Sequence, residues 1–407
     1  MRVERALLGS PKTLIRRQGM KARTPRGELD GWLLFVSIAL IAFGVVMVYS
    51  ASAVWADRYF HDGQHFLLRQ SCYALVGVAV MVVLSRVPFS LYQRATYPVL
   101  GLSLLLLVVV AIGFGHRAGG ASRWISVGPV HIQPAELSKF ALILWLAYSL
   151  SRKGEQIRSF SVGFLPHILV SALLMLLCLG QPDFGSAVMI GLLTVLMLFT
   201  AGAKLGYILT IVVAATPLAW ALVATSEYRL RRLRSFLEPF KHRYGAGYQV
   251  AESLISFGSG GVWGNGLGDS KQKLFFLPEA HTDFISAIVG EELGFVGVGM
   301  LVLAYGLLIW RGLRAAWRAK DEYATYLAVG ITAFLGVQSM TNLAVAMGML
   351  PTKGLVLPFV SYGGSSLLVN CASVGILLNA SRTSVEDEVF RQRVPQGFES
   401  ARGVMHA

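Results

Sequence analysis

Charged side chains are scarce in this chain. Asp, Glu, Lys and Arg together make up 14% of the 407 residues, whereas hydrophobic residues make up 55%. Apolar runs of roughly 17 to 25 residues, the length that crosses a bilayer, recur from end to end, and a soluble core does not require them. The composition therefore excludes an ordinary soluble domain and predicts an all-α polytopic membrane protein.

Cysteine is also scarce, with three residues in the whole chain. Cys72, Cys178 and Cys371 lie far apart, each inside an apolar run, which argues against a disulfide framework or a metal cluster. A short basic leader is lacking too: the first apolar run begins near Trp32, after about thirty residues of basic tail, so a cleaved secretory signal fits poorly. We expect this tail to be retained in the cytoplasm.

Ten apolar runs have the length of a membrane span. Lys and Arg in short loops mark the cytoplasmic side. Every second connection along the chain is basic, as a model with ten spans requires. Both termini are therefore predicted to be cytoplasmic, with a tail at 1–30, a membrane domain at 31–382 and a second tail at 383–407. The predicted helices cover residues 32–53, 66–84, 96–114, 134–151, 162–180, 186–202, 206–225, 284–310, 327–349 and 366–381.

The long connection at 227–283 lies on the outer face in this topology, although it is basic. Long loops cross a membrane largely regardless of their charge, so the topology stands. The cluster from Arg229 to Arg243 has two compatible interpretations, an amphipathic helix on anionic headgroups and a dedicated anion site. The rest of the outer face is basic as well, which suits a phosphorylated headgroup, and its basic residues include Arg117, Arg123, Lys271, Lys273 and Lys353.

Asp283 ends a polar stretch at 277–283, directly before an apolar run. One interpretation makes it the N-cap of a helix that starts at Phe284, since Asp is a preferred cap. A carboxylate held partly out of water beside other negative charge can also have a raised pKa and act as a general base. The two roles are compatible. More titratable groups converge on this helix entrance than capping requires, namely Glu279, His281, Glu291 and Glu292.

Two further motifs place charge at or inside apolar runs. Glu136 and Lys139 lie three residues apart in the span that opens at Pro134, so they can pair. Pro and Glu are favoured at a helix start, but a buried ion pair is costly, so we favour a role for the pair in function or in helix register. Asp183 lies in a short turn between two spans, where a bond to the local backbone and a functional role are equally open.

The last outer connection, at 351–366, is too apolar for a solvated loop and too rich in Pro and Gly for a helix. It predicts a re-entrant segment packed inside the protein, the setting in which irregular backbone is tolerated at membrane depth. The glycine-rich stretch at 258–268 could cradle a phosphate with its amides. No strand precedes it, however, so a flexible loop is the better interpretation.

Several of these stretches, in this order, resemble the SEDS family (shape, elongation, division and sporulation) over about residues 30 to 382. The stretches are Arg123-Trp124, Gln133–Lys139, Gln181–Gly185, Leu277–Asp283 with Gly290–Gly294, and Pro358–Ser366. The segments at 266–274 and 348–354 resemble the division branch of the family rather than the elongation branch. Asp269 departs from that branch, where Asn is expected, and adds negative charge near the site.

The resemblance implies a peptidoglycan glycosyltransferase that polymerises lipid II in septal wall synthesis, located at the division septum in the bacterial inner membrane. The implied partners are lipid II, membrane lipids, a class B penicillin-binding transpeptidase and other division proteins, with no nucleic acid. Asp283 is the implied catalytic base. The candidate substrate-binding residues are Arg123, Glu136, Lys139, Asp183, Lys273, His281, Lys353 and Ser361.

Lipid II carries an α linkage and the polymer a β linkage, so one displacement with inversion suffices. Asp283 then takes the proton from the 4-hydroxyl of the acceptor, and positive charge must meet the leaving diphosphate. A divalent cation such as Mg²⁺ or Mn²⁺ is open here, although no dedicated ligand cluster is visible. Two other functions also stay open: a division scaffold, and a lipid II flippase with a path along Glu136, Lys139, Gln338, Asn342 and Asn370.

Overall fold

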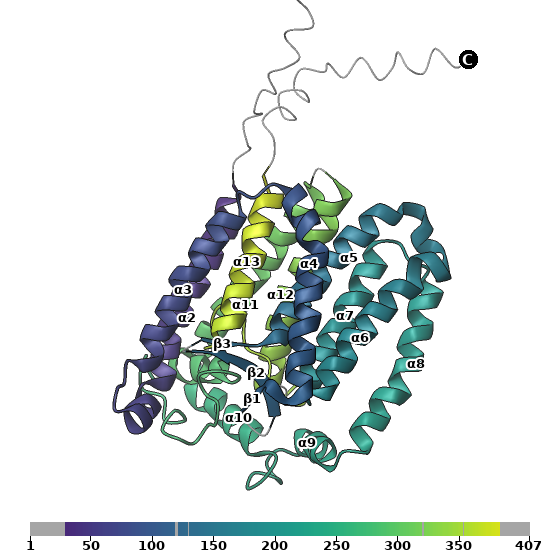
Figure 1. Cartoon of the computed structure of the whole chain (residues 1–407). Coiled ribbons are helices and arrows are strands. Elements are labelled where there is room, and N and C mark those ends of the chain that lie inside the picture. The colour runs from purple at the N-terminus through teal and green to yellow at the C-terminus, as the bar shows by residue number, and fades with distance from the viewer. Residues whose placement is uncertain (1–28, 119–120, 129, 320, 353, 383–407) are drawn as a thin grey trace, which may run out of the picture. The chain divides into compact units, whose positions relative to one another are not determined.

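The structure, a computed structural model, describes residues 29–118, 121–128, 130–319, 321–352 and 354–382. Both predicted tails lie outside this range apart from a few residues. Each of the ten predicted apolar ranges overlaps one long helix (Figure 1). These helices are α2 (Gly31–Phe60), α3 (His65–Leu84), α4 (Phe89–Val109), α5 (Pro134–Lys153), α6 (Leu165–Gly180), α7 (Phe184–Thr200), α8 (Leu205–Ala224), α11 (Ile285–Trp317), α12 (Glu322–Ala346) and α13 (Gly364–Ala380).

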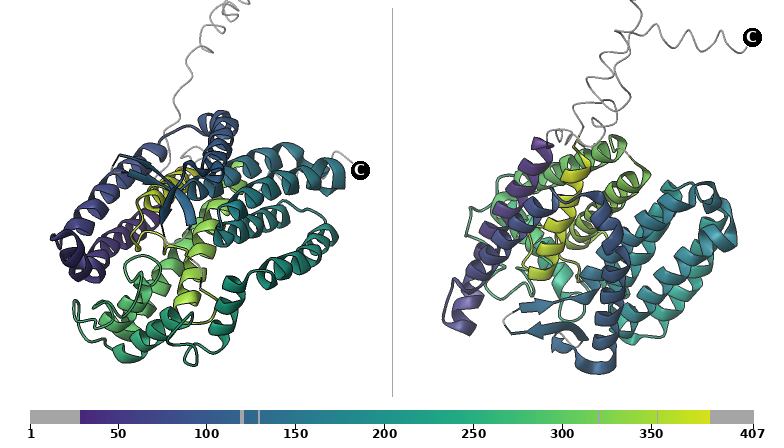
Figure 2. Two further views of the ribbon diagram at one scale, coloured as in Figure 1. Left: turned by 60° about the horizontal axis from the view of Figure 1, so that its bottom comes forward. Right: turned by 45° about the horizontal axis from the view of Figure 1, so that its top comes forward.

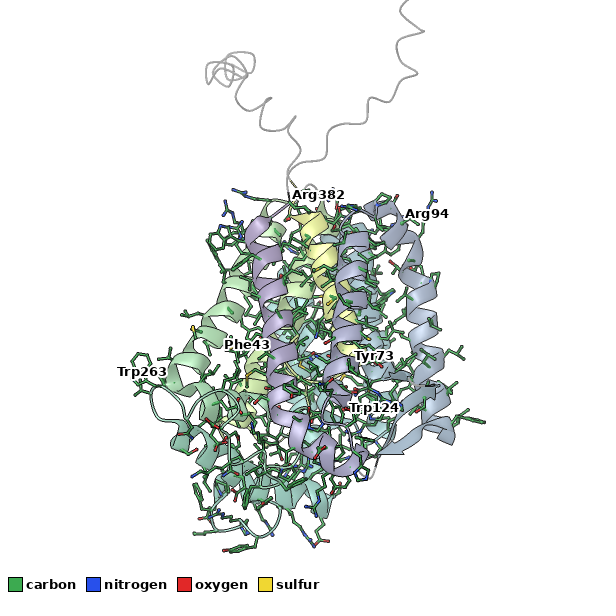
Figure 3. All side chains as sticks on the ribbon, turned by 90° about the vertical axis from the view of Figure 1, so that its left-hand side faces the viewer. Phe43, Tyr73, Arg94, Trp124, Trp263 and Arg382 are labelled. Atoms are coloured by element: carbon green, nitrogen blue, oxygen red, sulfur yellow. The ribbon has the colours of Figure 1, made fainter. Side chains whose placement is uncertain are left out.

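The described helices have the character of membrane spans. Seven of the segments they form are long and apolar enough to cross a bilayer. The helices α7 and α13 are shorter, with 17 residues each, and α5 carries two charges in its first turns. Figure 3 shows mainly carbon atoms along the middle of the helices, with nitrogen and oxygen atoms gathered at their two ends. The chain is therefore a mostly helical, multi-pass membrane protein.

The two ends of the described chain lie at the same end of the bundle. The Asp30 carboxylate accepts a hydrogen bond from the Leu33 amide at 3.0 Å and so caps α2. The same carboxylate pairs with Arg311 of α11 at 2.5 Å, and the Asp30 amide donates to the Ser381 hydroxyl at 3.4 Å. The start of α2, the cytoplasmic half of α11 in the predicted topology and the end of α13 are thereby joined.

The opposite end carries the structure that hydropathy did not predict. A three-stranded antiparallel sheet lies between α4 and α5, formed by β1 (His116–Ala118), β2 (Ala121–Val127) and β3 (Val130–Ile132). Two helices, α9 (Glu227–Leu237) and α10 (Tyr248–Gly260), lie at this end as well (Figures 1 and 2). The all-α prediction was wrong in this detail, because strands of three to seven residues are too short for a window of membrane-span length.

The segment between α12 and α13 is irregular and buried, which confirms the predicted packing inside the protein, while its re-entry into the membrane stays a prediction. Leu355, Leu357 and Phe359 are nearly inaccessible. Its carbonyl groups would be unsatisfied in an apolar interior, so side chains of the surrounding helices must bond them. The donors are Asn342, Gln338 and Tyr305, which bond the carbonyls of Leu355, Val356 and Pro358 at 2.6, 3.0 and 2.5 Å.

Gly44 of α2 permits this segment to pack closely. A Cβ atom at Gly44 would lie 2.3 Å from the Phe359 carbonyl oxygen and 2.8 Å from Cα of Val360. We expect Gly44→Ala to lower the stability of the protein by about 1–3 kcal/mol, since backbone cannot move aside as a side chain can. Gly101→Ala is the matched control, because nothing lies within 4 Å of a Cβ there. Thermal unfolding in detergent should separate the two, and equal midpoints would contradict the close packing.

Candidate active site

The loop that contains Asp283 is a compact turn. Glu279 has a positive φ of 56°, and its carbonyl oxygen accepts the amides of Thr282 and Phe284 at 3.2 and 3.3 Å. Helix α11 begins only at Ile285, with Phe284 in the cap position and no side chain bonded to the helix end. The predicted capping role of Asp283 was therefore wrong, because the carboxylate lies one residue too early in the chain.

Asp283 is half-buried at this end of the bundle and is held through its backbone. The Asn342 side-chain amide bonds the Asp283 carbonyl oxygen at 2.9 Å and the Leu355 carbonyl oxygen at 2.6 Å. A Cβ at Gly354 would lie 3.3 Å from Oδ2 of Asp283. The carboxylate thus lies against the connection between α12 and α13, with no capping duty to fix its charge.

The pKa of Asp283 is raised from its ordinary value to about 7, chiefly by burial. The charges of Glu279 and, more weakly, Asp183 contribute to this rise, whereas Arg232 and Arg123 oppose it. These four groups come from different parts of the chain, so the fold brings them within electrostatic reach of one carboxylate. A carboxylate that titrates near neutral pH has the proton affinity that a general base needs.

Arg123 and Asp183 fix the turn between α6 and α7. Arg123, on β2, donates from Nε to the Gln181 carbonyl at 3.4 Å and from its terminal nitrogen to the Pro182 carbonyl. The Asp183 carboxylate accepts the Ser186 amide at 3.1 Å and the Ser186 hydroxyl at 2.7 Å, so it caps α7. The local backbone role predicted for Asp183 is confirmed, and its charge still reaches Asp283.

Glu136 and Lys139 form the buried ion pair that their spacing predicts, with 2.6 Å between Nζ and Oε1. The Lys139 ammonium also donates to Oε1 of Gln338 at 3.3 Å, and it lies 5.3 Å from the centre of the Phe334 ring. Gln338 in turn bonds the Val356 carbonyl. The pair therefore connects α5 to α12 and to the re-entrant segment. In that segment the carbonyl oxygen of Leu355 accepts from the Asn342 side chain, which also bonds the carbonyl oxygen of Asp283.

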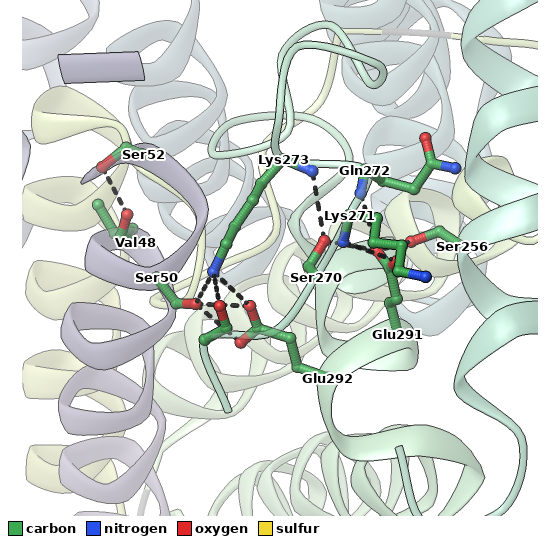
Figure 4. A network of polar contacts seen from close by, with 11 residues as sticks. Val48, Ser50, Ser52, Ser256, Ser270, Lys271, Gln272, Lys273, Glu291 and Glu292 are labelled. Carbon is green, nitrogen blue, oxygen red and sulfur yellow. Dashed lines mark hydrogen bonds and ion pairs between the residues drawn. The ribbon is translucent and has the colours of Figure 1, made fainter. Parts of the chain in front are cut away.

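Lys273 is engaged inside the protein. Its ammonium lies 3.1 Å from Oε1 of Glu292 and 2.5 Å from the Gly268 carbonyl oxygen, and Ser50 completes the group at 3.3 Å (Figure 4). Glu292 is fully buried, so this pair neutralises the lysine where the sequence suggested a cation for substrate.

Glu291 is also engaged inside the protein. Its carboxylate accepts the Lys271 amide at 2.9 Å and the Ser270 hydroxyl at 2.5 Å (Figure 4). Both Glu291 and Glu292 bond residues of the segment at 268–273. Their convergence on the Asp283 entrance stays a prediction.

The glycine-rich stretch has no free amides for a phosphate at its tightest point. The amides of Asn265 and Gly266 donate to the carbonyls of Glu291 and Glu292, each at 3.0 Å. These carbonyls are available because Gly294, with φ of 64°, interrupts α11. Gly264 packs so closely that a Cβ would lie 2.2 Å from the Glu292 carbonyl oxygen. The stretch is a packed loop on α11, and the phosphate-cradle interpretation fails there.

His281 and Ser361 brace the site. The His281 ring packs among Phe66, Trp55 and Tyr362 with ring centres 4.8, 5.9 and 5.9 Å away, and burial lowers its pKa. The Ser361 hydroxyl accepts the Leu357 amide at 2.9 Å within the re-entrant segment. Lys353 lies outside the described residues. Contact of any of these three with substrate stays a prediction.

Arg232 is a site residue that the sequence did not single out, and Asn342, named only on the flippase path, has a structural role that the sequence did not predict. Arg232 was one of several arginines in a basic cluster, and the structure distinguishes it by its effect on Asp283. Asn342 and Gln338 lie four residues apart in an apolar helix, so they share a face. That spacing was a signal for two side chains with a common task. No group of three or more His, Cys, Asp or Glu that could hold a metal ion occurs among the described residues. The divalent cation stays a prediction.

Known proteins resemble the whole membrane domain. The profile of the FtsW, RodA and SpoVE family, described as cell cycle protein, matches residues 31–386. A probable peptidoglycan glycosyltransferase FtsW of Geobacter metallireducens is 48% identical over 350 residues, 86% of this chain and 93% of that protein. A chain in the structure "Structural coordination of polymerization and crosslinking by a peptidoglycan synthase complex" gives a TM-score of 0.73 at 30% identity, covering 87% of this chain and 97% of that one. Rod shape determining protein RodA of Thermus thermophilus gives 0.60 at 29% identity, covering 90% and 98%.

Proposed function

The chain belongs to the FtsW, RodA and SpoVE family of cell cycle proteins and is a peptidoglycan glycosyltransferase of the FtsW type, and on this premise we propose that it polymerises lipid II with Asp283 as the general base. The observation that carries the proposal is a half-buried carboxylate with a pKa of about 7, within electrostatic reach of Glu279, Arg123 and Arg232. Such a group accepts a proton at neutral pH and is near the positive charge that a departing diphosphate requires.

The proposed step is a single in-line displacement. The 4-hydroxyl oxygen of the acceptor sugar forms a bond to the anomeric carbon of the donor while the bond from that carbon to the diphosphate breaks. The proton of the hydroxyl passes to the Asp283 carboxylate, and the bonding electron pair leaves with the diphosphate oxygen. One base and a set of cations suffice, so no covalent enzyme intermediate is needed. Among the described residues, Arg123 and Arg232 are the cations whose charges lower the pKa of Asp283.

Chain growth in detergent tests the activity against its rival. A flippase moves lipid II between membrane leaflets, so it has no product once the membrane is dissolved. The polymerase should form glycan strands from lipid II in detergent micelles, detected on gels after labelling of the stem peptide. The absence of polymer, with intact substrate recovered from a protein shown to be folded, would favour transport.

We extend the proposal to the topology. Ten spans with both termini in the cytoplasm account for the bond between Asp30 and Ser381 at one end of the bundle. The domain boundaries are those of a tail at 1–30, a membrane domain at 31–382 with its outer loop at 227–283, and a tail at 383–407. Cysteine labelling of intact cells at Tyr244, which is fully exposed, should succeed from the outside only if this loop is extracytoplasmic.

The location and partners follow from the family. We propose that the chain works at the division septum in the inner membrane, beside a class B penicillin-binding transpeptidase and other division proteins. A related chain belongs to a complex that coordinates polymerization and crosslinking, which supports this arrangement. Contacts of Arg123, Glu136, Lys139, Asp183, Lys273, His281, Lys353 and Ser361 with lipid II remain part of the same proposal.

The electrostatics of Asp283 predict a response to pH. Activity requires the deprotonated carboxylate, so kcat/KM for lipid II should rise with pH through about 7. Glu279→Gln removes a charge that raises this pKa, and the acid limb should therefore move to lower pH by roughly 0.2–0.7 units, since an exposed pair contributes about 0.2–1 kcal/mol. Gln retains the oxygen that accepts from Thr282. Glu238→Gln, an exposed change in the same loop, is the control without a shift, and a limb that moves upward in Glu279→Gln would refute the assignment.

A further inference from the structure

A pocket opens in the outer loop, between α9 and the turn that leads into α10. Its volume is about 390 Å³, and it is lined by Arg231, Arg232, Gly245, Ala246, Tyr248 and Gln249. Ligand pockets commonly have volumes of roughly 300–1,000 Å³. The lining combines two guanidinium groups with a phenol and an amide, and no carboxylate belongs to it. The pocket is thus built for a negatively charged, hydrogen-bonding ligand.

The turn opposite α9 is held in place by its own hydrogen bonds. The amides of Gly245 and Gly247 both donate to the His242 carbonyl, at 3.0 and 3.2 Å. Arg243 turns away to the buried carboxylate of Glu252, with 2.9 Å between the charged atoms. A Cβ at Gly247 would lie 2.7 Å from the Pro239 carbonyl oxygen, so the turn is closely packed. The backbone on this side of the pocket is therefore closely packed.

The two lining arginines differ in what holds them. Arg232 is half-buried and donates to the Thr352 carbonyl at 3.5 Å, beside the Asp283 site. Arg231 pairs with Glu227, one helical turn away, and the side chains are 66% and 77% exposed. An exposed pair of this kind contributes little, so a ligand with two or more negative charges can replace Glu227. Arg231 can thus turn to a ligand while Arg232 stays in position.

The helix that carries these arginines has the character of a surface-lying helix. Leu237 at its end and Phe240 just beyond it expose 70% and 59% of their surface. Arginines combined with exposed apolar groups near the helix end are typical of a helix that lies at the headgroup level of a membrane. A pocket beside such a helix would be near the phosphate groups of lipids.

We propose that this pocket binds a phosphate ester carried by a membrane lipid, and that in the reaction cycle this group is the diphosphate of the lipid-linked sugar donor. The proposal rests on the proposed function for the identity of the donor. Guanidinium groups match the oxygens of phosphate esters with paired hydrogen bonds, which favours them over a single ammonium.

The position of the pocket suits an inverting displacement. The base and the leaving group lie on opposite sides of the anomeric carbon, so the diphosphate site must be near Asp283 and separate from it. Arg232 meets both conditions, because it lines the pocket and its charge acts on Asp283. When the bond from carbon to diphosphate breaks, the added negative charge falls on an oxygen that faces Arg231 and Arg232.

Binding to the full-length protein in nanodiscs of phosphatidylcholine tests the proposal. The probes are undecaprenyl diphosphate and, in a separate arm, phosphatidylglycerol. Arg231→Gln and Arg232→Gln should each raise Kd for undecaprenyl diphosphate about tenfold, as loss of a charge-assisted contact does. Arg231→Lys should recover part of the loss. Arg234→Gln makes the same charge change on the same helix outside the pocket. It should raise Kd for undecaprenyl diphosphate by less than about threefold, and added salt should abolish this difference.

Two outcomes would overturn the proposal. One is an equal loss of affinity for undecaprenyl diphosphate in the pocket variants and in Arg234→Gln, which would show that only the overall positive charge of the helix matters. The other is loss confined to phosphatidylglycerol, which would make the pocket a site for bulk lipid headgroups. Asp283→Asn should bind undecaprenyl diphosphate at least as tightly as the wild type does. An error in the catalytic assignment would therefore change polymer formation and leave these binding results intact. Thermal unfolding of each variant shows that the compared proteins are folded.

Discussion

Replacement of Asp283 by Asn should lower the turnover number for glycan synthesis from lipid II by about 10²–10⁴-fold, the usual contribution of a positioned general base. Asn has the size and shape of Asp but cannot take a proton from the acceptor hydroxyl. The backbone of the loop should be unchanged, because Asn342 bonds the Asp283 carbonyl oxygen and not the carboxylate. The loss should therefore appear in kcat.

The KM for lipid II should stay the same or fall in this variant. Asp283 is a negative charge within reach of Arg123 and Arg232, and its removal leaves both cations to an anionic substrate. Two controls accompany the measurement. Glu279→Gln removes the same amount of charge four residues earlier in the loop and should retain activity. Asp283→Asn should unfold at or above the wild-type temperature, since a buried charge is removed. Activity within tenfold of wild type in Asp283→Asn would contradict the assignment.

Breaking the buried ion pair should have the largest effect on stability. Glu136→Gln or Lys139→Met alone leaves an uncompensated partner in an apolar interior, which costs about 3–5 kcal/mol. One oxygen of Glu136, Oε2, already has no hydrogen-bond partner in the described part of the chain, so the site has little capacity to absorb a further mismatch. Thermal unfolding in detergent should show both single variants well below the wild type.

The double variant Glu136→Gln/Lys139→Met separates structure from function. Removal of both charges should recover at least half of the lost stability, because no isolated charge remains. Activity should stay about tenfold down, since Lys139 no longer bonds Gln338, which holds the re-entrant segment beside Asn342 and Asp283. Full recovery of both quantities would reduce the pair to a device for helix register.

The sequence predicted the features that depend on neighbours in the chain. Apolar runs gave all the long helices to within a few residues at most ends, and the Pro and Gly content of 351–366 gave the buried irregular segment. The spacing of Glu136 and Lys139 gave their pair. Each of these depends on a period or a composition that a helix or a bilayer imposes directly.

The features that the sequence did not predict depend on contacts across the fold. Lys273 had the charge of a substrate cation, but its partner Glu292 belongs to a different element and to the interior. Asp283 does not occupy the cap position, because the turn at Glu279 makes the helix begin one residue later than predicted. Such a turn depends on a backbone conformation that a non-glycine residue rarely adopts. The importance of Arg232 among its neighbours follows from where α9 packs, which the basic pattern alone does not fix.

The pH dependence of chain growth in the wild type and in Asp283→Asn tests the central claim most directly. Both purified proteins are given lipid II in detergent, and initial rates are measured from below pH 6 to above pH 8. The wild type should show an acid limb with a midpoint near 7, set by the raised pKa of Asp283. The residual rate of Asp283→Asn should lack that limb. If the variant keeps the same limb at the same midpoint, another group is the one that titrates, and Asp283 is not the base.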